Sequence, residues 1–276
     1  MLVIFYGEIW EDWKGALSHT STTWDNLSYV ETVLLVEDSE FPLKQIASKY
    51  PETVLIPLKE QVILDHPQGY KTLIPSKELV NTASYKNLFY DLLSKHGFKE
   101  YYPQELSSPD FSKPFIVKRL HGESGLGIFL IWDEPRYNLI LQEQSLKNQP
   151  FILEEYIEGD DEYVFYVVCK GGEILWHASL VAQPPKDSRV QKGSFTNASE
   201  IEISEEIYKV FEGIFKALNY EGPANFNYKL KEGKPIIFEM NPRMGGSMMK
   251  PKFRHLVAGC VEAIILNAYL KEYGTS

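Results

Sequence analysis

Short runs of β-branched and other apolar residues predict three strands near the N-terminus. They cover Leu2–Tyr6, Thr32–Glu37 and Thr53–Pro57, with a helix expected over Phe41–Lys49 between the second and the third. Strands that alternate with helical segments are typical of an α/β unit. The pattern therefore predicts a small α/β leader over residues 1–80.

A helical period follows this leader. Ser84 is expected to cap a helix over residues 84–96, and Gly97 to end it. Apolar side chains recur there at the spacing of one helix face. They are Tyr85, Leu88, Phe89, Leu92 and Leu93.

The pattern of the remaining chain predicts hairpins and two helices. The expected strands are Phe115–Lys118, Ile128–Trp132, 151–157, Tyr163–Cys169, Glu173–Val181, Asn225–Leu230 and Pro235–Met240. Ser204 is expected to cap a helix that runs to Leu218, and a final helix is expected over Arg254–Tyr269. This order predicts an α+β fold with mainly antiparallel sheets behind the leader.

Composition excludes several classes of protein. The 276 residues are 44% hydrophobic and 24% charged, which is ordinary for a globular chain with a sizeable core. A formal net charge of −10 repels phosphate backbones, so neither a nucleic acid nor a membrane is an expected partner. No apolar run is long enough to span a bilayer, the N-terminus lacks the features of a signal peptide, and Cys169 and Cys260 are the only cysteines. A cytoplasmic location is therefore expected.

The first candidate for chemistry is a glycine-containing turn after Lys118. The turn contains Gly122, Glu123, Ser124, Gly125 and Gly127. Glycines let backbone N–H groups approach an anion closely, and a lysine supplies a point charge to a phosphate. On these residues alone, a phosphate-binding loop and an ordinary hairpin turn are equally compatible with the sequence.

The second candidate is an acidic stretch that follows a hydrophobic strand. It contains Glu154, Glu155, Tyr156, Ile157 and Glu162. A solvated turn is the simpler interpretation of these acids. The functional alternative is a hinge whose backbone and Glu154 contact an adenine edge, while Glu162 accepts hydrogen bonds from ribose hydroxyls.

The third candidate is a hairpin near the C-terminus. Glu239 and Asn241 share one face of a strand, because alternate residues point to the same side, and the partner strand brings Asn227 to a similar position. Carboxylate and carbonyl oxygens are the ligands that Mg²⁺ prefers. Arg243 follows directly and offers a bidentate fork for a phosphate or a carboxylate. This hairpin predicts a metal and phosphate site.

These three stretches, in this order, resemble the ATP-grasp superfamily. The run Glu239-Met-Asn-Pro-Arg243 resembles its carbamoyl-phosphate-synthetase-like branch of carboxylate–amine ligases. The resemblance implies an ATP-grasp fold, in which two α+β subdomains hold ATP between antiparallel sheets, preceded by a shortened leader. The implied domains are residues 1–80 for the leader, 84–157 with the glycine loop, and 158–276 with the metal site.

The resemblance also implies contacts with the nucleotide. Lys86 and Lys118 match lysines that contact the phosphates, and the glycine loop matches a segment that closes over them. The acidic stretch matches the adenine hinge and the ribose-binding acid. The ATP-binding residues implied in this way are Lys86, Lys118, Gly122, Glu123, Ser124, Gly125, Gly127, Glu154, Glu155, Tyr156, Ile157 and Glu162.

Asn227, Glu239 and Asn241 match the family's Mg²⁺ ligands, with Mn²⁺ as an alternative ion. Arg243 and Lys118 match the residues that act on the transferring phosphate. The position of Asn227 usually holds Glu, Asp or Gln, so this chain departs from the family by a shorter, neutral ligand. One negative charge fewer would weaken the binding of a second Mg²⁺.

The implied activity is ATP- and Mg-dependent ligation, in which a small carboxylate becomes an acyl phosphate that an amine acceptor then attacks. An amino acid or small peptide is the expected type of substrate, and Arg189, Lys192 and Arg254 are candidates for binding its carboxylate. The alternatives are a phosphotransferase acting on a small metabolite, and a nucleotide-binding regulatory protein with weak or no turnover. A homodimer is compatible with the sequence.

Overall fold

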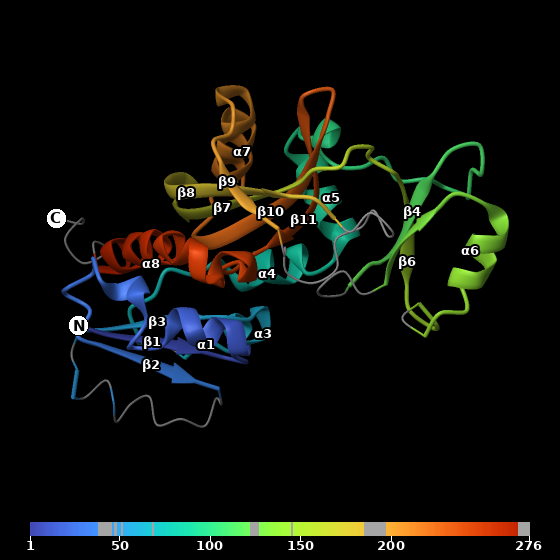
Figure 1. Ribbon diagram of the computed structural model, residues 1–276. Coiled ribbons are helices and arrows are strands. Elements are labelled where there is room, and N and C mark those ends of the chain that lie inside the picture. The colour runs from blue at the N-terminus through green and yellow to red at the C-terminus, as the bar shows by residue number, and fades with distance from the viewer. Residues whose placement is uncertain are drawn as a thin grey trace.

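The computed structural model describes residues 1–37, 46, 49–50, 52–67, 69–121, 127–144, 146–184 and 197–269. Their strands form three sheets, which we call the leader sheet (β2-β1-β3), the small sheet (β5-β4-β6) and the large sheet (β11-β10-β7-β8-β9). Figure 1 shows the small sheet at one end of the molecule and the leader sheet below α8 and α4. None of the helices described in these ranges is long and apolar enough to cross a membrane.

The leader sheet is parallel, which confirms the predicted α/β unit. It consists of β1 (Leu2–Tyr6), β2 (Thr32–Val36) and β3 (Thr53–Pro57), flanked by α1 (Glu11–Leu17), the 3-10 helix η1 (Thr22–Trp24) and α3 (Glu60–Leu64). All five residues of β1 are buried, because apolar clusters cover both faces of this central strand. The helix predicted over Phe41–Lys49 lies almost wholly outside the described residues.

Two helices occupy residues 77–95, whereas the sequence predicted a single helix over residues 84–96. The Ser76 hydroxyl caps α4 (Lys77–Ala83), and α5 (Lys86–Lys95) begins after Tyr85. The prediction that Ser84 caps α5 is wrong, because Ser84 ends α4 and its hydroxyl donates a hydrogen bond back into that helix. A serine between two abutting helices can serve either one, and the sequence pattern did not reveal α4.

The buried face of α5 also differs from the predicted stripe. Phe89, Tyr90 and Leu93 are buried, whereas Tyr85 and Leu88 are each 43% exposed. The buried residues share an apolar cluster with the large sheet. The division into 1–80, 84–157 and 158–276 stays a prediction, and α4 runs across the first of its boundaries.

The small sheet is antiparallel and carries a core of its own. Its strands are β4 (Phe115–Arg119), β5 (Ile128–Ile131) and β6 (Phe151–Glu155), with α6 (Glu134–Ile140) packed against them. The 3-10 helix η2 (Lys99–Tyr101) precedes it. The amide of Lys86 donates to the Leu120 carbonyl at 3.1 Å, which joins the start of α5 to the end of β4.

The large sheet is antiparallel and lies between two helical layers. Ser204 caps α7, as predicted, and α8 has the predicted bounds. Helices α5 and α7 pack on one face, while α8 and the leader pack on the other in a shared apolar cluster. The leader is therefore fixed to the large sheet. The elements are β7 (Glu162–Lys170), β8 (Glu173–Ala182), β9 (Ser199–Ile201), α7 (Glu205–Ala217), β10 (Gly222–Lys231), β11 (Lys234–Asn241), η3 (Gly246–Met249), η4 (Pro251–Phe253) and α8 (Arg254–Tyr269).

Candidate active site

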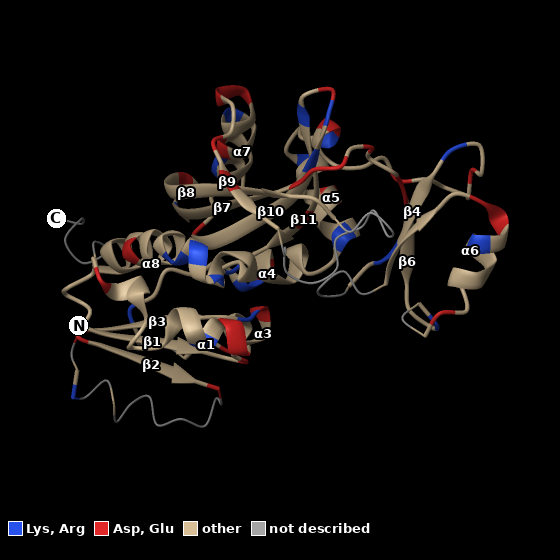
Figure 2. Ribbon diagram, viewed as in Figure 1, with Lys and Arg blue, Asp and Glu red and all other residues tan. Residues whose placement is uncertain are grey.

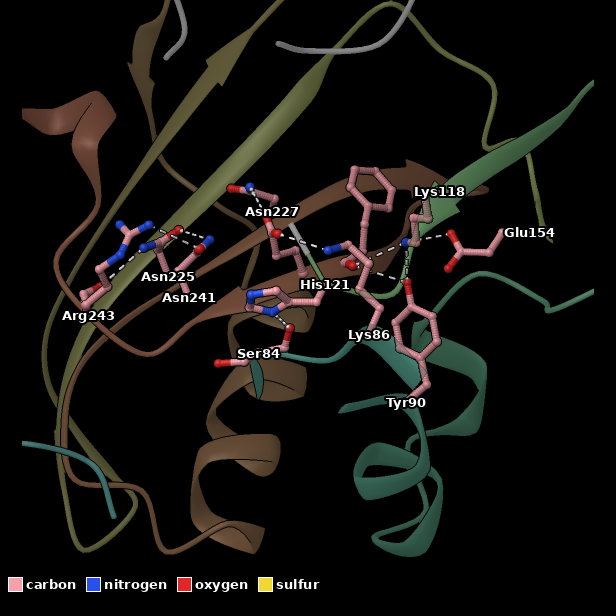
Figure 3. A network of polar contacts seen from close by, with 12 residues as sticks. Ser84, Lys86, Tyr90, Lys118, His121, Glu154, Asn225, Asn227, Asn241 and Arg243 are labelled. Atoms are coloured by element: carbon pink, nitrogen blue, oxygen red, sulfur yellow. Dashed lines mark hydrogen bonds and ion pairs between the residues drawn. The ribbon is translucent and has the colours of Figure 1, made fainter. Parts of the chain in front are cut away.

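The β10–β11 hairpin gathers the residues predicted to hold a metal. Asn227 lies opposite Glu239, Asn225 lies opposite Asn241, and the register shifts directly after Asn227. An irregularity of this kind re-aims side chains and is common next to active sites. Figure 3 shows Asn225 and Asn241 in contact with each other and with Arg243, and Asn227 beside them.

Both oxygens of the Glu239 carboxylate accept hydrogen bonds. Nδ2 of Asn227 donates to Oε2 at 3.1 Å, and the buried ammonium group of Lys86 donates to Oε1 at 3.5 Å. Because Nδ2 of Asn227 points to Glu239, Oδ1 is the atom that this amide leaves for a cation. The fold thus brings together predicted phosphate and metal residues that are 153 positions apart.

Asn225 belongs to the same site, although the sequence analysis did not single it out. It is buried, and its Oδ1 accepts from Nδ2 of Asn241 at 3.1 Å, while its own Nδ2 donates to the Arg243 carbonyl at 3.3 Å. These bonds fix the orientation of the Asn241 amide. Asn225 precedes Asn227 by two positions in a strand, so the alternation of faces was a signal that could have identified it.

Arg243 lies between the β10–β11 hairpin, which we call the metal hairpin, and the leader. Its Nε donates to Oε1 of Glu60 at 2.9 Å, Nη1 donates to the Met244 carbonyl at 3.0 Å, and Nη2 donates to Oδ1 of Asn241 at 3.5 Å. Its side chain is 12% exposed. Glu60, the first residue of α3, was not predicted as part of the site.

Lys118 and Glu154 form an ion pair in the interior. Nζ of Lys118 lies 2.6 Å from Oε2 of Glu154, donates to the Tyr90 hydroxyl at 2.6 Å and to the Phe238 carbonyl at 3.4 Å. Burial lowers the pKa of Lys118 and raises the pKa of Glu154, because each loses solvation of its charge. Tyr90 donates in turn to the Phe238 carbonyl at 3.1 Å. This tyrosine is a further residue of the site that the sequence analysis missed.

The second oxygen of the Glu154 carboxylate differs from the first. Oε1 is buried and makes no hydrogen bond with the described residues. A buried acceptor without a donor costs free energy, about 1–3 kcal/mol for a neutral group and more for a charged one. The atom therefore fits a ligand that brings an N–H or O–H donor to this position.

Lys229 organises the predicted hinge after β6. Its buried ammonium group donates to the carbonyls of Ile157 at 3.4 Å and Gly159 at 2.8 Å, and it lies 5.3 Å from the ring centroid of Tyr156. These contacts hold the backbone that follows the strand in one conformation. Ile157 is buried, as expected for the apolar side of a base-binding hinge.

The two remaining acids of the hinge differ in environment. Glu162 is buried, and burial raises its pKa to about 7, with a further rise from Glu239 opposed by Lys229. Glu155 instead accepts from the Gln104 amide at 3.0 Å and forms an ion pair with Lys231. Glu155 is therefore held at the outer edge of the sheet.

Other predicted residues lie elsewhere or cannot be placed. Gly127 has a φ of +75°, and a Cβ atom there would lie 2.4 Å from Cδ of Arg119, so only glycine fits. Arg254 donates to Oγ1 of Thr22 on the leader at 3.2 Å, and so faces the leader. Gly122, Glu123, Ser124, Gly125, Arg189 and Lys192 lie outside the described residues.

The oxygen atoms of the hairpin suit a metal ion whose remaining ligands come from a bound substrate. Within the described ranges there is no group of three or more His, Cys, Asp or Glu that could hold a metal ion. The hairpin offers one carboxylate and two amide oxygens, from Glu239, Asn227 and Asn241. Mg²⁺ is usually bound by one or two carboxylates, waters and the phosphates of a substrate, so the arrangement fits this ion in the presence of a nucleotide.

Comparison with known proteins agrees with this geometry. The family model of the ATP-grasp domain matches residues 83–247. The multifunctional protein pyr-3 of Neurospora crassa is 24% identical over 237 residues, which are 80% of this chain and 12% of that protein. D-alanine–D-alanine ligase of Petrotoga mobilis is 25% identical over 172 residues, which are 56% of each chain. This chain therefore spans less than two thirds of either relative.

A solved structure extends the likeness to the leader. D-alanine–D-alanine ligase from Bacillus anthracis, complexed with ATP, has a TM-score of 0.64 and 17% identity to this chain, over 99% of both chains. At this identity the likeness concerns the fold, and it confirms the predicted architecture, leader included. The range that the family model matches contains the hairpin, Lys86, Lys118 and Glu154 but leaves Glu60 outside.

Proposed function

Because the chain belongs to the ATP-grasp family, we propose that it is an ATP- and Mg²⁺-dependent ligase that activates a carboxylate as an acyl phosphate and joins it to an amine. The observation that carries this proposal is the row of polar side chains that runs from the buried pair Glu154 and Lys118, past the pair Lys86 and Glu239, to Arg243 (Figure 3). Its two ends suit the base and the transferring phosphate of one nucleotide.

The nucleotide end is formed by the small sheet and the hinge. Oε1 of Glu154, which accepts no hydrogen bond from the part of the chain that the structure describes, fits the exocyclic amine of adenine as donor. Glu162 accepts from the ribose hydroxyls, and Tyr156 and Ile157 line the base. Lys86 and Lys118 contact the phosphates.

The metal end is formed by the large sheet. Asn227, Glu239 and Asn241 supply three oxygens, and Asn225 supports the set by turning the Asn241 amide. A bound Mg²⁺ would neutralise charge on the β- and γ-phosphates, and Mn²⁺ would serve the same ligands. On this proposal residues 84–157 and 158–276 hold ATP between them, and residues 1–80 are the leader.

The chain's own groups then act by position and charge. Arg243 and Lys118 stabilise the phosphoryl group as it passes to the substrate carboxylate, because their charges meet the charge that develops on its oxygens. No thiol nucleophile takes part, since Cys169 and Cys260 are buried and burial raises the pKa of both. The amine acceptor then displaces phosphate from the acyl phosphate.

The substrate class is proposed as an amino acid or small peptide. The test is a screen for ADP release from Mg·ATP across amino acids and dipeptides, with assay of inorganic phosphate and mass spectrometry of the product. A ligase gives ADP, phosphate and a condensed product in equal amounts. A phosphorylated product without free phosphate would indicate a phosphotransferase instead, and nucleotide binding with no turnover would indicate a regulatory protein.

A further inference from the structure

We propose that Glu60 of the leader is a positioning residue for Arg243, so that the phosphoryl-transfer step depends on a carboxylate outside the ATP-grasp core. The inference rests on the proposed function. Oε1 of Glu60 accepts from Nε of Arg243 at 2.9 Å, across a sequence separation of 183 residues. The two side chains are 21% and 12% exposed, so the pair is largely shielded from solvent.

Glu60 is itself held in place by the leader sheet. It follows the end of β3 and lies two positions after Leu58, which is fully buried and whose amide donates to the Tyr6 carbonyl at 3.0 Å. Ile63, one turn further along α3, is also buried. A side chain on a rigid element can define the position of its partner more closely than one on a loop.

The contact divides the donors of Arg243 between support and function. Glu60 takes the Nε–H group, and the Met244 carbonyl takes one N–H of Nη1. Nη2 is directed to Asn241 at 3.5 Å, the weakest of the three contacts. The Nε side is therefore fixed on the leader, and Nη2 remains directed toward the metal hairpin, where a phosphoryl group would lie.

Apolar packing beside the Glu60–Arg243 pair fixes the leader against the segment that follows the hairpin. Met244, Met248 and Met249, which follow Arg243, share one apolar cluster with Val3 and Phe5 of the leader sheet. Figure 2 shows acidic positions on α1 and α3, and basic positions at the end of α8 nearest to α1. The leader thus brings the Glu60 carboxylate to Arg243, next to an apolar cluster that already packs the leader against the rest of the chain.

The test is a double-mutant cycle on kcat in the full-length chain. Glu60→Ala, Arg243→Ala and the double variant are compared by ADP release from Mg·ATP with an equimolar mixture of the twenty amino acids. We expect Glu60→Ala to lower kcat by about tenfold or more and to change KM for ATP by less than about threefold. In the Arg243→Ala background the same substitution should have no further effect, because its partner is absent.

Controls separate positioning from folding and from the proposed function. Arg243→Lys is a second background, which keeps a cation but lacks the Nε–H group, and Glu37→Gln removes a leader ion pair with Lys14 that does not involve Arg243. Glu37→Gln should turn over like the wild type, and Glu60→Gln, which keeps an acceptor, should retain more activity than Glu60→Ala. An equal loss from Glu60→Ala in all backgrounds would overturn this inference alone. A wild-type chain that releases no ADP either with this mixture or with the dipeptides of the substrate screen would overturn the proposed function and the inference with it.

Discussion

Lys118, which is proposed to contact the phosphates, and Glu154, which is proposed to contact the base, are bound to each other, with 2.6 Å between Nζ and Oε2. Both side chains are only 3% exposed. They come from adjacent strands of the small sheet, where Ile116 pairs with Glu154 and Lys118 with Ile152. The pair keeps two charged groups neutralised in the interior, at the place where a nucleotide would enter.

The first prediction concerns the stability of this pair. Lys118→Met leaves the Glu154 carboxylate buried without its cation, and breaking a buried ion pair costs about 3–5 kcal/mol. The double variant Lys118→Met/Glu154→Gln should recover most of the free energy of unfolding, because it leaves no buried charge alone. Urea unfolding at pH 7 measures both. A Lys118→Met variant as stable as the wild type would contradict the buried pair.

The second prediction concerns the metal. Glu239→Gln removes the single carboxylate of the hairpin site and should abolish the part of the thermal shift that requires Mg²⁺ together with ATP. When Mg·ATP is present at 100 times its Kd, its binding stabilises the wild-type fold by about 2.7 kcal/mol. Thermal unfolding with Mg·ATP, compared with ATP and a chelator, measures the difference. Turnover should fall by about a hundredfold or more.

Glu232→Gln is the matched control for the metal site. Glu232 is an exposed acid in the turn of the same hairpin, so its loss changes the net charge equally without touching the proposed ligands. Its variant should keep the full Mg-dependent shift. If both variants lose the shift to the same extent, the metal is attracted by the charge of the hairpin as a whole and the assignment to Glu239 fails.

The third prediction is a pH dependence from Glu162. Burial raises the pKa of this carboxyl from its usual value of 4.5 to about 7 in the folded chain. The folded state therefore binds more protons than the unfolded state between these two values. Its contribution to stability is complete below pH 4.5 and is lost as the pH rises through 7. The loss amounts to up to about 3 kcal/mol.

Glu162→Gln removes the titration and keeps the shape of the side chain. The free energy of unfolding of the variant minus that of the wild type should therefore increase from pH 5 to pH 8. Urea unfolding at four pH values across this window measures it. The same difference at every pH would show that Glu162 titrates normally in the folded chain.

The sequence was sufficient for the elements that depend on local periodicity. The bounds of α8 and the Ser204 cap of α7 were predicted, because continuous helical spacing and an N-cap residue are both visible in a short window. The opposed pair Asn227 and Glu239 was also within reach, since a short hairpin sets its own register. The bulge after Asn227 was not visible in the sequence.

The contacts across the fold could not be predicted from local patterns. Tyr90 has the spacing of an ordinary core residue on α5, and only the packing of α5 against β4 and β11 shows that its hydroxyl meets Lys118 and the Phe238 carbonyl. Glu60 and Arg243 are 183 residues apart, so their contact depends on how the leader docks. Such pairs are decided by tertiary structure and leave no periodic signal.

The last prediction uses Gly245, which follows Arg243 by two positions. A Cβ atom at Gly245 would lie 2.3 Å from Cε1 of Tyr166 and 3.2 Å from Nδ2 of Asn225. Tyr166 is fully buried and cannot retreat, so the added methyl group must displace Asn225 or the backbone after Arg243. Gly245→Ala is therefore expected to cost about 1–3 kcal/mol of stability.

The substitution should also lower turnover, because a displaced Asn225 no longer orients the Asn241 amide. Gly213→Ala is the matched control: a Cβ there meets Phe98 at an ordinary 3.5 Å, and alanine favours a helix such as α7 by up to about 1 kcal/mol over glycine. Urea unfolding should show a lower free energy of unfolding for Gly245→Ala and a higher one for Gly213→Ala. ADP release should be lost only in Gly245→Ala. Equal activity in the two variants would mean that Asn225 does not need its present position, and the support assigned to it would be wrong.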